Sequence, residues 1–179
     1  MKNLLYSFLL LPFLISCKKN VVDELPPATQ TGANTFGAKV NDKLWVPSSS
    51  PIPGAAKLEA RYAVNDLIIN ARNLGSTPVE SEFEIYIKDL NGAGIYPLNQ
   101  NTPIYPNQVA NYGYYISRNI TPINEWMTSS QFTGSVNITL DDRVNHIVSG
   151  TFQFDALNLF GNPDTLHVTE GRFDIKINF

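Results

Sequence analysis

Residues 131–140 read QFTGSVNITL, a stretch in which apolar and polar side chains alternate without interruption. The positions that share one face carry, besides Gly134, only large apolar side chains: Phe132, Val136, Ile138 and Leu140. A period of two is typical of a β-strand that buries one face and leaves the other in water. The stretch therefore predicts a half-buried strand of an antiparallel sheet.

The same alternation recurs outward from this stretch. It returns in residues 83–87, 151–156 and 172–179, where the last run turns Phe173 and Ile175 to one face and Arg172 and Asp174 to the other. Turn sequences such as Asn-Asp and Asn-Pro-Asp separate the runs, as in hairpins. Residues 35–179 therefore predict a single all-β domain of about ten strands, and residues 123–127 allow one helical turn at most.

Antiparallel strands without crossover helices leave two architectures. One is a β-sandwich of two sheets, and the alternative is an up-and-down, lipocalin-like barrel that could hold a small apolar ligand. Long connections at residues 47–56, 99–108 and 118–130 favour the sandwich, because they resemble crossings between sheets more than tight hairpin turns. Trp45, in an early hairpin, is expected to fill the core.

Composition and motif content exclude several classes of function. The chain has 179 residues, 43% of them hydrophobic and 16% charged, which indicates a packed globule. Its formal net charge of −3 gives no basic surface for nucleic acid. The two histidines, His146 and His167, lack metal-ligand spacing, and no GxSxG motif is present. We therefore expect no metal, no cofactor, no catalytic residues and no enzymatic activity.

The N-terminal residues predict a targeting signal. Lys2 and the apolar run of residues 4–15 have the order and length of an export signal, well short of the about 20 residues that span a bilayer. Residues 14–17, LISC, resemble the lipobox of bacterial lipoproteins, and Cys17 is the only cysteine. We expect residues 1–16 to be a lipoprotein signal peptide and Cys17 to be acylated, with palmitate among its acyl groups, at the outer membrane, on its periplasmic or its surface face. A soluble secreted protein with an incidental cysteine is the alternative.

Residues 17–34 are polar and contain Pro26 and Pro27, so they are expected to form a flexible tether between the lipid and the domain. The segments 25–32 (LPPATQTG) and 35–47 (TFGAKVNDKLWVP), with 150–152 (GTF) and 171–174 (GRFD) near the end, resemble a family of small Bacteroidota lipoproteins classed as a domain of unknown function. The resemblance implies envelope localisation and an all-β domain, and it implies no activity.

Three surface features are candidate sites. Tyr112 and Tyr114 share one face of a predicted strand, where we expect them to pack in the core or on the sheet; the alternative is that they form an aromatic platform for a glycan with Trp126. Residues 164–166 (DTL) resemble an acceptor for O-glycosylation at Thr165. Glu80, Glu82 and Glu84 also share a face, which we expect to be solvated.

These observations predict a lipid-anchored envelope lipoprotein with a non-catalytic binding or scaffolding domain. A module that binds a glycan or a small apolar ligand is the alternative, and a hydrolase assembled from Ser149, His146 and an aspartate is the weaker one. The expected partners are the membrane, through Cys17, and a glycan or an envelope protein.

Overall fold

The computed structural model describes residues 24–49, 56–75, 79–103, 109–118, 123–161 and 163–177. These residues form antiparallel strands and no helix, and so no helix that could span a membrane. The strands are β1 (Thr35–Val40), β2 (Lys43–Trp45), β3 (Leu58–Ala63), β4 (Asp66–Asn73), β5 (Glu80–Ile87), β6 (Gly94–Leu98), β7 (Tyr112–Arg118), β8 (Ile123–Met127), β9 (Gly134–Asp142), β10 (Ile147–Asn158) and β11 (Thr165–Lys176). The all-β prediction is confirmed, but residues 123–127 form a strand where the sequence allowed a helical turn.

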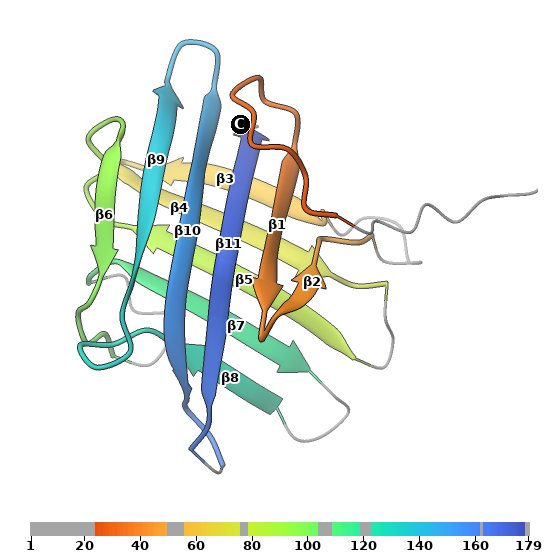
Figure 1. Ribbon diagram of the computed structural model, residues 1–179. Coiled ribbons are helices and arrows are strands. Elements are labelled where there is room, and N and C mark those ends of the chain that lie inside the picture. Colours follow the sequence, from red (N-terminus) through yellow and green to blue (C-terminus); the bar gives the residue numbers. More distant parts are fainter. Residues whose placement is uncertain are drawn as a thin grey trace, which may run out of the picture.

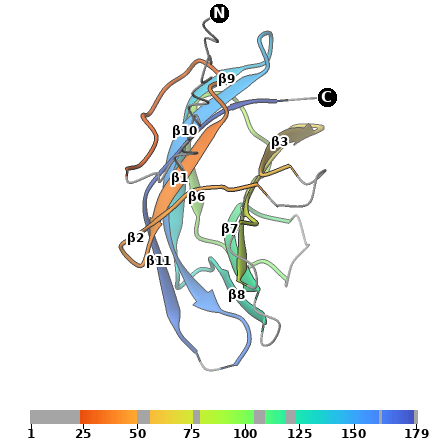
Figure 2. The same ribbon diagram turned by 90° about the vertical axis from the view of Figure 1, so that its right-hand side faces the viewer.

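The strands make one curled sheet that folds over itself as two layers (Figures 1 and 2). The first layer runs β6-β9-β10-β11-β1-β2, and the second runs β8-β7-β5-β4-β3. The long strand β10 joins the layers, because it pairs with β9 along its length while Leu157 and Asn158 pair with β8. The fold is therefore a half-barrel that has features of both expected architectures.

Aromatic rings fill the space between the layers. Phe83 of the second layer is fully buried, and its ring centroid lies 4.7 Å from Trp45 and 5.6 Å from Phe36 of the first layer. Trp45 is buried as predicted, and its indole N–H donates to Ser81 Oγ at 2.8 Å. Gly171 is required next to this core, because a Cβ there would lie 2.6 Å from the Phe152 ring.

Strand β9 has one buried face and one exposed face, as the alternation in residues 131–140 predicted. In β9, Val136 and Ile138 are buried in the core, whereas Asn137 and Thr139 are exposed on the opposite face. Each layer therefore has an inner face, packed against the other layer, and an outer face. The polar side chains with functional potential lie on the two outer faces.

Candidate functional site

The predicted aromatic platform is not assembled. Tyr112 and Tyr114 share the outer face of the second layer, as their spacing predicts, but they are 0% and 5% exposed. Trp126 projects from the inner face, since it pairs with Tyr115, whose ring lies 5.8 Å from its own. The prediction that Tyr112, Tyr114 and Trp126 form one surface is wrong, because adjacent strand residues alternate between faces.

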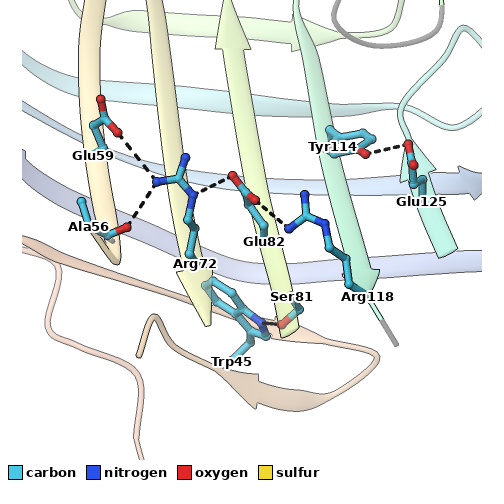
Figure 3. Close-up of polar contacts among 9 residues, drawn as sticks. All are labelled: Trp45, Ala56, Glu59, Arg72, Ser81, Glu82, Tyr114, Arg118 and Glu125. Atoms are coloured by element: carbon cyan, nitrogen blue, oxygen red, sulfur yellow. Dashed lines mark hydrogen bonds and ion pairs between the residues drawn. The ribbon is translucent and has the colours of Figure 1, made fainter. Parts of the chain in front are cut away.

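The buried tyrosines of the second layer are bonded to carboxylates. Tyr112 Oη donates to Glu84. Tyr114 Oη donates to Glu125 Oε2 at 2.6 Å (Figure 3). The Tyr86 ring stacks on Tyr112 with centroids 5.2 Å apart. Burial, together with the hydrogen bond to Asp66, raises the pKa of Tyr86 well above its ordinary value of 10. These tyrosines therefore act as neutral donors that fix the carboxylates in place.

A ladder of charges crosses the same outer face (Figure 3). Arg72 Nε lies 3.0 Å from Glu82 Oε1, and Arg118 Nη1 lies 3.2 Å from Glu82 Oε2, so Glu82 stands between two guanidinium groups. Arg72 also reaches Glu59 Oε2 at 3.8 Å and the Ala56 carbonyl at 3.2 Å. The sequence did not single out the two arginines, because only the strand register shows that they flank Glu82.

The expectation of a solvated row of glutamates is only partly met. Glu80, Glu82 and Glu84 do share the outer face, but Glu84 is 6% exposed and bonded to Tyr112. The Glu82 side chain is 15% exposed. Alternation predicts which face a side chain occupies, and it does not predict how much of that face is covered.

The outer face of the first layer holds the N-terminal segment. We call residues 29–33 the clasp, because they surround Asp174 of β11, which is fully buried. Asp174 Oδ2 accepts from Thr29 Oγ1 at 2.6 Å and from the Thr31 and Ala33 N–H groups, and Oδ1 accepts from the Gly32 N–H at 2.8 Å. Ser149 Oγ also donates to Oδ1, at 2.8 Å.

Two opposing effects set the charge state of Asp174. Burial alone would raise the pKa of its carboxyl group, but the donors from Thr29, Thr31, Ser149 and Ala33 stabilise the ionised form and hold the pKa well below its usual range. Gly37 of β1 adds to the attachment, since a Cβ there would lie 2.7 Å from Pro26 Cδ. The tether expected at residues 17–34 is therefore too long, because residues 29–33 are part of the folded domain.

One histidine of the first layer has a carboxylate partner. His167 Nδ1 lies 2.7 Å from Asp155 Oδ1, but both side chains are more than half exposed. Such a pair is screened by water and resembles a surface ion pair more than a catalytic dyad in a cleft. No group of three or more His, Cys, Asp or Glu side chains that could hold a metal ion occurs in the part of the chain that the structure describes.

A family model described as Domain of unknown function (DUF6252) matches residues 33–175, which include all eleven strands but for the last residue of β11. The chain belongs to the DUF6252 family. The expected membership of a family of unknown function is thus confirmed. No match to the DUF6252 chain was found among curated proteins or among solved structures.

Of the two predicted modification sites in this DUF6252 chain, one lies among the described residues and the other lies outside them. Thr165 is the first residue of β11 and is partly exposed, and its neighbour Asp164 accepts a hydrogen bond from the Trp126 indole at 3.1 Å. O-glycosylation there stays a prediction. Cys17 lies outside the described residues, so its acylation also stays a prediction of the sequence.

Proposed function

We propose that this chain is a lipid-anchored lipoprotein of the bacterial outer membrane that acts by binding and not by catalysis. Acyl chains on Cys17, the single cysteine, would hold it on the membrane. Each buried methylene contributes roughly 0.8 kcal/mol, so two or more acyl chains suffice for stable anchoring. The apolar run and the LISC sequence before the globular domain support this assignment.

The clasp is the observation that carries the proposal furthest. It attaches the segment that follows the expected anchor to the outer face of the first layer through Asp174. Residues 18–28 would remain as the linker between the expected anchor and the clasp, and they reach at most about 36 Å when fully extended. A domain on so short a linker stays close to the membrane, where it would meet ligands or partners of the envelope.

Binding is favoured over catalysis because acidic side chains of the second layer are already held in ion pairs and hydrogen bonds. The carboxylates on the outer face of the second layer are bonded to Arg72, Arg118 and tyrosine hydroxyls, as in a structural network. A small apolar ligand in the interior is disfavoured, because the rings around Phe83 occupy that space.

Metabolic labelling of cells that express the full chain with an alkyne palmitate analogue tests the anchor. We expect label on the wild-type protein and its recovery in the outer-membrane fraction, and neither for Cys17→Ser. Ser16→Ala is the matched control, since it keeps a small residue before the cysteine and should label normally. Membrane recovery of Cys17→Ser equal to wild type would refute the lipid anchor.

A further inference from the structure

A polar groove crosses the outer face of the first layer. Two adjoining hollows form it, of about 310 Å³ and 340 Å³, and both are lined by Ser135 of β9 and Gln153 of β10. One hollow continues to Asn137, Thr151 and Arg172, and the other continues to Thr133, Asp155 and Thr169. Because the hollows share lining residues, they make one groove, ~13 Å long at the residue spacing of a strand.

The side chains of the groove have unused hydrogen-bonding groups. Six of them carry a hydroxyl or an amide and make no hydrogen bond to another described residue: Thr133, Ser135, Asn137, Thr151, Gln153 and Thr169. All six stand on β9, β10 and β11 or directly before β9, so the sheet holds their directions. Such an array offers donors and acceptors at fixed backbone positions to a ligand that carries many donors and acceptors.

Charged side chains line the groove only at its two ends, and each lies beside another polar group there. Glu170 Oε1 lies 2.6 Å from Lys39 Nζ, and Glu170 Oε2 lies 3.9 Å from Arg172 Nη2. At the other end, His167 Nδ1 lies 2.7 Å from Asp155 Oδ1. The six side chains between these ends are uncharged. This arrangement favours a neutral ligand over a polyanion such as nucleic acid.

The position of the groove within the sheet argues against an extended peptide. Peptides that add a strand need an unpaired strand edge. Here β9 already pairs with β6 and β10, and β11 pairs with β10 and β1, so backbone groups of the groove are used within the sheet. A ligand in this groove is recognised by side chains alone.

The clasp lies just beyond one end of the groove. Asp174 and Ser149 stand two residues along their strands from Arg172 and Thr151, which line that end. Across the sheet, Gln30 Nε2 donates to the Thr139 carbonyl of β9 at 3.2 Å. The N-terminal segment therefore lies beside β11 at this end of the groove (Figure 1), and its Gln30 side chain reaches toward β9.

We propose that this groove binds a neutral glycan chain through the ring hydroxyls of its sugars. The inference deepens the proposed binding function and rests on it. The rings of Phe152 and Phe154 are buried in the core, so hydrogen bonds would carry the affinity without aromatic stacking. A dissociation constant on the order of 1 mM for one groove follows from a few such bonds, and repeated chains would bind more tightly by avidity.

Titration of the full-length protein, purified in detergent, with neutral hexasaccharides of glucose, mannose, galactose and N-acetylglucosamine tests the groove, with heparin as the anionic comparison. The groove variants are Gln153→Ala and Ser135→Val. Their matched controls are Gln131→Ala, at an exposed position before β9, and Thr139→Val, on the outer face of β9 beyond the groove.

We expect at least one neutral hexasaccharide to bind, each groove variant to weaken binding about three- to tenfold, and both controls to match wild type. The proposal is overturned if no neutral sugar binds, if heparin alone binds, or if groove and control variants lose affinity equally. Cys17→Ser separates the two proposals, because it should lose the membrane anchor and keep the sugar affinity.

Discussion

The two outer faces of the sandwich use polar side chains in opposite ways. On the second layer, polar groups bond one another: Glu82 lies between Arg72 and Arg118, and Tyr114 donates to Glu125. On the first layer, the groove side chains around Ser135 and Gln153 have no partner among the described residues. The first arrangement stabilises the sheet, whereas the second leaves bonding groups available to a ligand.

The clasp is the exception that sharpens this contrast. Asp174 lies on the groove side of the molecule, yet it is as fully bonded as the residues of the second layer. All of its partners except Ser149 come from a segment more than a hundred residues earlier in the chain. The contrast therefore depends on whether another segment covers a position.

Asp174→Ala should give the largest loss, about 2–4 kcal/mol of unfolding free energy, because the buried Ser149 hydroxyl and the clasp donors lose their acceptor. Denaturant unfolding measures the loss, and hydrogen exchange should show the Gly32 amide losing protection. Asp155→Ala is the control on the same outer face, since that side chain is 54% exposed, and it should cost less than about 1 kcal/mol. Equal losses for the two variants would contradict the structural role of the clasp.

Asp174 also makes stability depend on pH. Its pKa is lowered in the folded state, so it binds fewer protons folded than unfolded, and its stabilisation is present above the ordinary aspartate pKa of about 3.9. That stabilisation is lost as the pH falls through this value toward the lower folded pKa. Unfolding curves of wild type and Asp174→Ala should therefore converge on acidification, and a constant gap down to the acid limit would count against this assignment.

Glu82→Gln should cost about 1–2 kcal/mol, because it leaves Arg72 and Arg118 facing each other without the carboxylate between them. Part of the difference should disappear at high salt, which screens the repulsion. Glu59→Gln is the matched control, since its ion pair is 3.8 Å long and its side chain is 44% exposed. That variant should stay within about 0.5 kcal/mol of wild type.

Tyr114→Phe should cost about 1 kcal/mol, the net value of one buried hydrogen bond to a carboxylate. The ring remains, so packing against the neighbouring side chains is kept, and thermal unfolding should show a modest decrease in Tm. A variant as stable as wild type would mean that the bond between Tyr114 and Glu125 contributes nothing to the fold.

Gln153→Ala should have the smallest effect on stability, within about 0.5 kcal/mol, because its side chain is exposed and its amide makes no hydrogen bond to another described residue. Thermal unfolding of the variant beside wild type measures it. A loss above 1 kcal/mol would remove the distinction between the two outer faces, since the groove side chains would then support the fold.

Sequence and structure agree best where the argument is local. The alternation in residues 131–140 assigned Val136 and Ile138 to the core. The spacing of Tyr112 and Tyr114 likewise placed both side chains on one face of a strand. The position of Trp126 could not be assigned in this way, because it depends on the register that places it opposite Tyr115. The same holds for Arg72 and Arg118, because only the register of β4, β5 and β7 brings them to either side of Glu82.

The sequence by itself determined that this chain is an all-β domain, which side chains of each strand share a face, and that the only cysteine follows an apolar run at residues 4–15. The tertiary structure alone decided what those faces do. Asp174 stands at a polar position of an alternating strand, and it is buried because residues 29–33 fold over it. Alternation is a property of the extended backbone, whereas cover on an outer face depends on which distant segment packs there.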